Sequence, residues 1–422
     1  MGRTPRTQCA AVGLIALLSL LAACDGGGPQ EQSQDQAPTE SFLELMAYVP
    51  AAREYQQVCF SSPRRFLDAA GFEDVRTVEQ TVALLEKQSL VEVRDTDLSI
   101  EAVSVPSLYT DYWKIWFVKL RDLLGVEFFQ IEDLLSTGLD YLDVVRGPFD
   151  GEALAGALVA QNYAQEDHRG VPFYATGGDF HPAFIVGEGG LETLTDLGAM
   201  VIDRMNRVWL QDGTLVAAPA TQIMTDSIDA SSGRIPSILD RPEYRRTAEG
   251  LGPVHAACLL DPAQYSDEAL LDSAAYLVME TSPEPPAPET QSQFDQRLEA
   301  ARRELVERLP SQYPEWDRLE PPGLLALGYY RNPDGTSVLK VGLWYGDKRK
   351  AKANAPELQK RLAQYQSETW GKPLCDEAEA RSQAWSDGSL AVADCRGGLA
   401  HQWTWALKAG DLLFLLERLP GQ

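Results

Sequence analysis

The sequence predicts an α+β fold made of two related modules, each a mixed or antiparallel β-sheet with helices packed on one face. Segments that alternate apolar and polar residues, typical of strands, are separated by segments with helical periodicity and helix caps. Asp212-Gly213 and Asp387-Gly388 each separate two strand-like runs, and such pairs favour tight hairpin turns because these turns need positive φ. An order of strand, helix, strand and hairpin is typical of a sheet with helices on one face.

The first module is expected to span residues 42–280, beginning at the apolar cluster after Phe42. Pro is favoured at the first position of a helix and Gly just past its end, and a Thr followed three residues later by Gln is typical of a capping box. The first elements predicted are a helix from Ser62-Pro63 to Gly71, a helix from Thr77 with Gln80 to about Gln88, and strands over 90–94 and 98–105.

An aromatic stripe follows on a predicted helix. Its members are Tyr109, Tyr112, Trp113, Trp116, Leu120, Leu123 and Leu124. Such a face lies either in the core or on a membrane surface. We favour the core, because acids and few lysines flank the stripe, whereas membrane-surface helices are rich in lysine and arginine.

The rest of the first module gives clearer signals. Asp150 and Asp240 are placed to cap the helices that follow them, and Pro242 lies in the first turn of the second. Residues 178–206 fit no single period. The predicted elements are strand 142–149, helix 151–160, strand 169–177, strands 207–211 and 214–219, helix 220–229, helix 241–249 and strand 254–260.

A Pro- and acid-rich segment, 281–292, is the predicted linker to the second module, 293–422. The elements expected there are helix 293–308, strands 324–331 and 337–346, helix 355–368, strands 382–385 and 389–395, and a final strand pair at 402–407 and 412–419. Residues 209–215 and 385–390 share a Trp, then Asp-Gly, a hydroxyl residue and Leu. This match is the evidence that the two modules are variants of one unit.

The N-terminal segment, 1–23, has the pattern of a signal peptide. Arg3 and Arg6 form a basic start, and an apolar run of about fifteen residues follows, short of the roughly twenty that a spanning helix needs. Leu21-Ala22-Ala23-Cys24 resembles the lipobox of bacterial lipoproteins. This resemblance implies cleavage before Cys24 and acylation of its sulfur; the alternative is an ordinary secretory signal with a chance Cys.

The predicted anchor places the protein on a bacterial cell membrane, lipid-anchored and facing the extracytoplasmic side, with the bilayer as a partner through Cys24. Stable anchoring needs two or more acyl chains, because each buried methylene contributes only about 0.8 kcal/mol. Residues 24–41 are rich in Gly, Pro, Gln and Ser and are expected to be a disordered tether. Asp25 resembles an inner-membrane retention signal, and the sequence leaves inner or outer membrane open.

The net charge of the chain is −25, and removing residues 1–23, with two Arg and no acid, brings it to −27. Such a surface repels phosphate backbones, so nucleic acid is excluded as a partner. Beyond Cys24 there are four cysteines in a compartment that permits disulfides. Cys375 and Cys395 are the favoured pair, and their loop of about twenty residues would contribute about 3 kcal/mol. Cys59 and Cys258 are left as a second pair or as free thiols.

No catalytic or cofactor motif is present, so no catalytic residue, cofactor or metal is assigned. Asp167, His168, Asp179 and His181 are the nearest approach to a metal cluster, but exposed loop residues explain them better. Carboxylates are abundant, which leaves a hydrolase with a carboxylate pair as the alternative to a non-catalytic function.

Trp403 and Trp405 lie on one face of a predicted strand, because their spacing is two. They either line a groove for a carbohydrate or a peptide or belong to the core, and the core is favoured. The function expected is a binding or scaffolding module at the cell envelope, with an unknown protein or carbohydrate partner.

A series of short motifs, Arg-Gly-Val-Pro-Phe-Tyr at 169–174, Asp-Gly-Thr-Leu at 212–215 and Asp-Arg-Pro-Glu-Tyr at 240–244, is similar to uncharacterised families of exported bacterial lipoproteins. The likeness is best over residues 143–262. Its motifs form turns and caps, so it implies a fold and no site residues.

Overall fold

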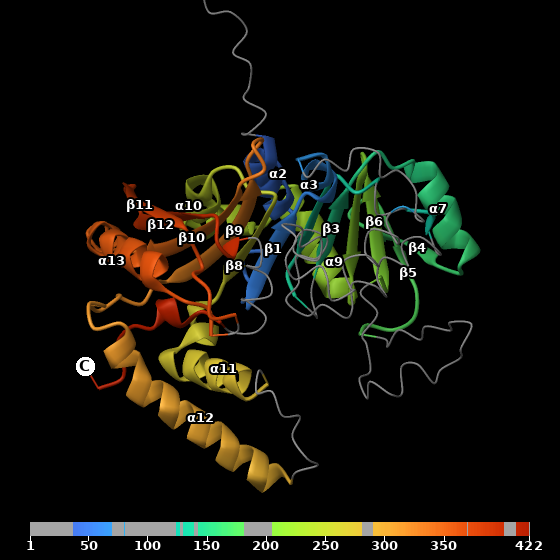
Figure 1. Cartoon of the computed structure of the whole chain (residues 1–422). Coiled ribbons are helices and arrows are strands. Elements are labelled where there is room, and N and C mark those ends of the chain that lie inside the picture. The colour runs from blue at the N-terminus through green and yellow to red at the C-terminus, as the bar shows by residue number, and fades with distance from the viewer. Residues whose placement is uncertain are drawn as a thin grey trace, which may run out of the picture. The chain divides into compact units, whose positions relative to one another are not determined.

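The computed structural model describes residues 37–69, 80, 124–126, 130–138, 142–180, 205–280, 290–368, 370–400 and 411–421. From Pro38 onward the described residues belong to one compact unit. The fold is α+β, as predicted: helices accompany a sheet of twelve strands in which all neighbouring strands are antiparallel (Figure 1). The order across the sheet is β11-β12-β10-β9-β8-β1-β2-β3-β7-β6-β5-β4.

The strands in chain order are β1 Gln57–Ser61, β2 Asp133–Ser136, β3 Asp143–Arg146, β4 Ala164–His168, β5 Val171–Ala175, β6 Arg207–Gln211, β7 Thr214–Ala218, β8 Ala256–Leu260, β9 Leu324–Arg331, β10 Ser337–Tyr345, β11 Glu377–Ala384 and β12 Ser389–Arg396. The helices are α2 Ala37–Met46, α3 Pro63–Ala69, α7 Gly151–Ala160, α9 Thr221–Ser231, α10 Pro242–Leu251, α11 Asp267–Glu280, α12 Gln291–Gln312 and α13 Lys350–Gln364. Short 3-10 turns are η3 Ile238–Asp240, η4 Pro262–Tyr265 and η6 Leu413–Leu415.

The sheet continues across the predicted module boundary. β8, the last strand of the first predicted module, pairs with β9 of the second, and Cys258 lies opposite Leu327. The two-module organisation is therefore not confirmed, because strands of both predicted modules share one sheet. Of the predicted linker 281–292, residues 281–289 lie outside the described part of the chain.

The prediction that helices pack on one face of the sheet is wrong: helices cover both faces, so the central strands are buried on both sides. One face packs against α2, α9 and α10 in a core that runs across both halves, from Trp209 to Val392. The opposite face has two cores, one against α3 and α11–α13 and a smaller one against α7. α11 and α12 pack side by side, and α7 lies near β6, toward the β4 edge (Figure 1).

Two local predictions are confirmed by the backbone and its hydrogen bonds. The Asp150 carboxylate caps α7 by accepting hydrogen bonds from the backbone N–H groups of Glu152 and Ala153 at 3.0 and 3.1 Å. Asp212 and Gly213 have φ values of 40° and 75°, as the primed hairpin turn between β6 and β7 requires.

Three other predictions are wrong. Asp240 does not cap α10; its carboxylate accepts a hydrogen bond from the backbone N–H of Ser237 at 2.9 Å and closes the capping box of η3. Residues 412–419 contain the short turn η6, Leu413–Leu415, and no strand. The carbonyls of Phe414 and Leu416 accept hydrogen bonds from Arg361 instead of pairing with another strand. The predicted tether ends earlier, since α2 already begins at Ala37.

Some element boundaries also differ. α13 begins five residues before the predicted position 355, and β11 begins at Glu377 instead of 382. β4 carries no apolar alternation because it is an exposed strand at one edge of the described sheet, so the sequence did not indicate it. Polar edges of this kind discourage pairing with a second chain.

Two disulfides join described residues, Cys375 with Cys395 and Cys59 with Cys258. Cys59 and Cys258 are directly opposite on β1 and β8, with their Cα atoms 4.0 Å apart. The second pairing thus crosslinks strands that are 199 residues apart in sequence. Among the helices that the structure describes, none is long and apolar enough to cross a bilayer.

Candidate functional site

A groove with a volume of about 900 Å³ lies where α2 and α9 approach the ends of β3, β5, β6 and β7. Its lining residues are Leu43, Glu44, Leu45, Ala47, Tyr48, Arg146, Gly170, Val171, Pro172, Trp209, Leu210, Gln211, Thr214, Ile228, Ser231, Ser232 and Leu239. Only Glu44 and Arg146 among them are charged, so the groove is an apolar surface with one acidic and one basic group.

Two hairpins and two helices build the groove. The β4–β5 turn has positive φ at Arg169 and Gly170, and the β6–β7 turn has positive φ at Asp212 and Gly213. Tight turns bring the starts of β5 and β7 beside the end of β6, at one end of the sheet. α2 buries Phe42, Leu45 and Met46 in the core beneath it, which leaves its neighbouring face toward the groove.

An aromatic pair forms part of the wall. The rings of Tyr48 and Trp209 are tilted by 53° with centroids 5.8 Å apart, a favourable arrangement for two aromatic rings. Trp209 is nearly buried, whereas Leu43, Val171 and Leu239 are half-buried and present apolar atoms to the opening. An apolar ligand would therefore gain contact area without displacing strongly hydrated groups.

Arg146 is held from behind by a buried acid. Its Nε and Nη2 atoms donate to Asp133 Oδ2 at 3.1 and 2.7 Å, while Ser62 Oγ donates to Asp133 Oδ1 at 2.5 Å. The third nitrogen, Nη1, donates to the carboxylate of Glu44 on α2. Burial alone would lower the pKa of Arg146, but its hydrogen bonds to the carboxylates of Asp133 and Glu44 outweigh burial and raise the pKa.

A second charged cluster lies beside the groove, around Asp229 in α9. His168, Arg169 and Arg234 approach its carboxylate at 3.2, 3.5 and 3.2 Å. Burial tends to raise the pKa of Asp229, but hydrogen bonds from His168 and Arg234 prevail and lower it. The cluster ties the β4–β5 turn to the end of α9 and so fixes this side of the groove.

The metal candidates of the sequence that the structure describes are not placed to hold a metal ion together. His168 binds Asp229, whereas Asp179 accepts hydrogen bonds from Arg207 and Thr221 at 2.8 and 2.9 Å. Among the residues described, no group of three His, Cys, Asp or Glu side chains is placed to hold a metal ion. His181 lies outside the described residues, as do Cys24, Trp403, Trp405 and residues 109–123 of the aromatic stripe.

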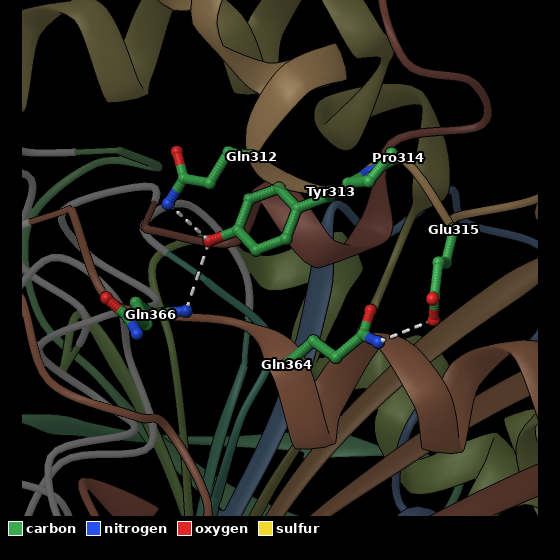
Figure 2. Close-up of a pocket in the computed structure, with 6 residues that line it drawn as sticks. All are labelled: Gln312, Tyr313, Pro314, Glu315, Gln364 and Gln366. Carbon is green, nitrogen blue, oxygen red and sulfur yellow. Dashed lines mark hydrogen bonds between the residues drawn. The ribbon is translucent and has the colours of Figure 1, made fainter.

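A smaller and more polar pocket of about 420 Å³ lies at the end of α12 (Figure 2). Its Tyr313 hydroxyl accepts hydrogen bonds from Gln312 Nε2 at 3.0 Å and from the backbone N–H of Gln366 at 3.2 Å. Gln364 Nε2 donates to Glu315 at 3.4 Å, and its Oε1 accepts from the Trp316 indole at 2.9 Å. Because these polar groups largely bind one another, they fit a structural role.

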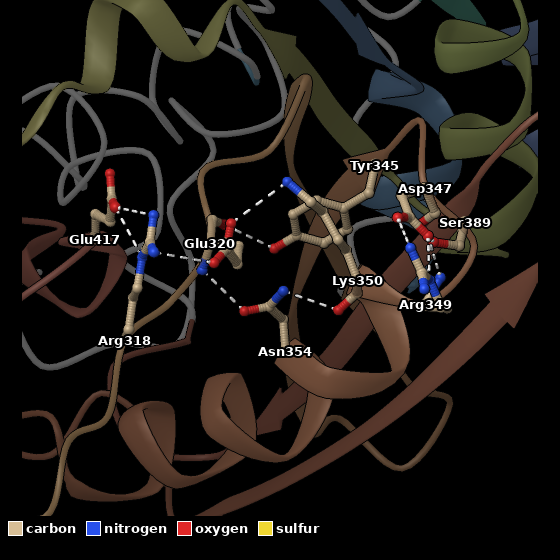
Figure 3. A network of polar contacts seen from close by, with 9 residues as sticks. All are labelled: Arg318, Glu320, Tyr345, Asp347, Arg349, Lys350, Asn354, Ser389 and Glu417. Carbon is tan, nitrogen blue, oxygen red and sulfur yellow. Dashed lines mark hydrogen bonds and ion pairs between the residues drawn. The ribbon is translucent and has the colours of Figure 1, made fainter.

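A polar network around Glu320 joins the segment after α12 to α13 (Figure 3). Arg318 and Lys350 both approach the Glu320 carboxylate at 3.3 Å. The backbone of Glu320 is bound as well, by the Tyr345 hydroxyl at 3.0 Å and by Asn354 Oδ1 at 2.9 Å. The network satisfies the part-buried backbone N–H and C=O of Glu320, as a stable loop connection needs.

Arg146 and Glu44 were missed by the sequence analysis. They are 102 residues apart, and Arg146 is 13 residues from Asp133. No short motif links them. A weak signal was available only for Arg146, a cation at the end of a strand otherwise made of apolar residues and one acid.

No family model matches the chain, and no curated protein matches it. One solved structure, titled "Structure of crystal form I of TP0453", aligns over 87% of this chain and 98% of that chain. The TM-score is 0.30 and the sequence identity is 8%, so this similarity supports no argument about fold or function. The similarity to uncharacterised exported lipoproteins stays a prediction from the sequence.

Proposed function

We propose that this chain is a lipid-anchored, non-catalytic binding protein of the bacterial cell envelope that holds an apolar ligand in the groove. The observation that carries the proposal is the groove itself, an opening of about 900 Å³ whose walls are apolar apart from one Arg–Glu pair and a few neutral polar groups. Ligand pockets typically have volumes of about 300–1,000 Å³ and are lined mainly by apolar and aromatic side chains with few polar groups.

The alternative function, hydrolysis by a carboxylate pair, has weaker support. Among the described acids, Glu368 has a pKa that burial raises, but its carboxylate is bound by Arg308 at 2.6 Å. The nearby Asp411 accepts hydrogen bonds from Ser367 Oγ at 2.5 Å and from the backbone N–H of Glu368 at 3.1 Å. These contacts fit a network that holds the segment after α13, so we do not advance the hydrolase.

Calorimetric titration with decanol, an uncharged alkyl probe, tests the groove. The full chain carrying Cys24→Ser is the suitable protein, because acyl chains on Cys24 would compete for an apolar site. We expect binding that Ala47→Phe weakens at least about tenfold, since the added ring fills space between α2 and the strands. Ala153→Phe, on the exposed face of α7, is the matched control and should leave the affinity unchanged. Equal binding by all three proteins, or none by any, contradicts the proposal.

Fractionation tests the anchor separately. In a bacterial host we expect the chain in the membrane fraction, with a mature N-terminal peptide whose Cys24 bears acyl chains. Cys24→Ser should move the protein to the soluble fraction, because the remaining chain is acidic and its surface repels anionic headgroups. A product that stays soluble and retains residues 1–23 would refute the anchor and leave the groove result standing.

A further inference from the structure

The Arg146 guanidinium has a fixed orientation at the groove. Asp133, whose side chain is only 1% exposed, binds two of its nitrogens, and Ser62 holds the other oxygen of Asp133. A planar guanidinium held along one edge presents its remaining N–H groups in a set direction. Arg146 therefore needs no rearrangement to receive an anion at Nη1.

In the structure, the anion at Arg146 Nη1 is the carboxylate of Glu44. The Glu44 side chain is nevertheless 64% exposed. Exposed ion pairs contribute little, about 0–1 kcal/mol, because water and salt screen them and ordering two side chains costs entropy. A carboxylate from outside can thus exchange with Glu44 at small cost, whereas Asp133 cannot be exchanged.

The surroundings define what such a ligand must look like. Most residues that line the groove are apolar or neutral, and among them only Arg146 and Glu44 are charged. The cation is fixed by a buried partner and the anion is free to swing into water, so the recognising group is the cation. The complementary molecule has one carboxylate and an extended apolar body.

We propose that the groove binds a long-chain carboxylic acid as its anion, with the carboxylate on Arg146 and the alkyl chain along Tyr48, Trp209 and Val171, and that Glu44 holds this place when the groove is empty. The inference rests on the proposed function, since it names the class of ligand for the same groove. It assigns Arg146 to recognition and Glu44 to competition with the ligand.

Titration of the Cys24→Ser chain with decanoate, decanol and decylamine, below their aggregation concentrations, tests this inference. We expect decanoate to bind most tightly. Glu44→Gln removes the competing carboxylate and should tighten decanoate binding about fivefold to tenfold, with decanol unchanged. Glu40→Gln is the matched control, an exposed acid one turn earlier on α2, and should change neither affinity.

Arg146→Met supplies the second variant. It should weaken decanoate binding at least about tenfold and leave decanol binding within about threefold. Because this change leaves Asp133 without its partner, circular dichroism must show that the variant is folded, and Glu44→Gln decides the question if it is not.

The outcomes separate the two proposals. If decanoate and decanol bind with equal affinity, both in the parent and in Glu44→Gln, the carboxylate inference is overturned. The proposal that the groove binds an apolar ligand would then still stand. Tightest binding by decylamine would also overturn it, because Glu44 would then be the recognising group. Binding of none of the three probes would remove the proposed function itself.

Discussion

Two buried or half-buried arginines, one beside the groove and one under the C-terminal segment, are held in different ways. Arg361 on α13 is fully buried, and its nitrogens donate to the Glu357 carboxylate at 2.9 Å and to the carbonyls of Asp317, Phe414 and Leu416. Arg146 has a 24% exposed side chain, and one of its nitrogens is bound only by the exposed Glu44.

This contrast distinguishes an arginine that stabilises the fold from one that can bind a ligand. Every nitrogen of Arg361 donates to the chain itself, either to the Glu357 carboxylate or to a backbone carbonyl. The side chain is fully buried, so a ligand has no access to it. Arg146 combines one immobile partner with one exchangeable partner, and it faces a groove. Burial sets whether an arginine is needed for stability, and the exchangeable partner sets whether it can bind something else.

The variant with the largest expected effect is Arg361→Met, which tests whether Arg361 is a structural cation. Removing one partner of a buried ion pair typically costs about 3–5 kcal/mol, and here three carbonyls also lose their donor. We expect a large fall in the melting temperature of Arg361→Met. Thermal unfolding monitored by circular dichroism measures it. Arg349→Met is the matched control, because the Arg349 side chain is 91% exposed, and it should lower the melting temperature far less than Arg361→Met does. Equal melting temperatures for the two variants would show that Arg361 is not structural.

A second test addresses the groove's frame. In Gly213→Val a β-branched residue must adopt φ near 75°, and its Cβ would lie 2.9 Å from the carbonyl oxygen of Gly147. Such a position costs about 1–3 kcal/mol. Because the turn aligns β6 with β7, decanol binding should weaken together with stability.

Gly151→Ala is the control for that change. Gly151 begins α7, has no positive φ, and its added Cβ would meet nothing within 4 Å. The stability of the Gly151→Ala variant should stay the same or rise slightly, since Ala favours the helix. An unchanged melting temperature for Gly213→Val would mean that the turn tolerates a side chain and that the hairpin does not depend on its glycine.

The sequence contained the local part of this structure. The cap at Asp150 and the turn at Asp212-Gly213 depend on residues two or three positions apart, so their chemistry can be read along the chain. The sheet order depends on pairs such as Cys59 with Cys258, which are distant in sequence. Alternation of apolar and polar residues predicts a strand but does not indicate which strand pairs with it. That is why two modules were expected where one sheet exists.

The groove could not be predicted for the same reason. Trp209 was recognised as part of a hairpin, but Tyr48 reaches it from the turn after α2, which precedes β6 by more than a hundred residues. Asp240 shows the converse error, a correct capping residue assigned to the wrong helix because two helical turns start close together there. Tertiary contacts, which propensity does not contain, decide both cases.

The smallest expected effect concerns a third arginine, which extends the comparison to full exposure. Arg349 binds Asp347 at 3.0 Å, and its side-chain and backbone hydrogen bonds lower the pKa of Asp347 from 3.8 to about 2 (Figure 3). A carboxyl whose folded pKa is depressed stabilises the fold above its ordinary pKa and loses that contribution as the pH falls through the folded value. NMR titration of the carboxyl carbon should find a midpoint near 2 in the parent chain, and Arg349→Gln should raise it toward 3.8.

Asp334 gives an internal control for that titration, since hydrogen bonds from Thr336 lower its pKa without any arginine. Its midpoint should be the same in the parent and in Arg349→Gln. If Asp347 keeps its low pKa in the variant, then the backbone N–H at position 349 is sufficient to bind the carboxylate, and the guanidinium adds nothing.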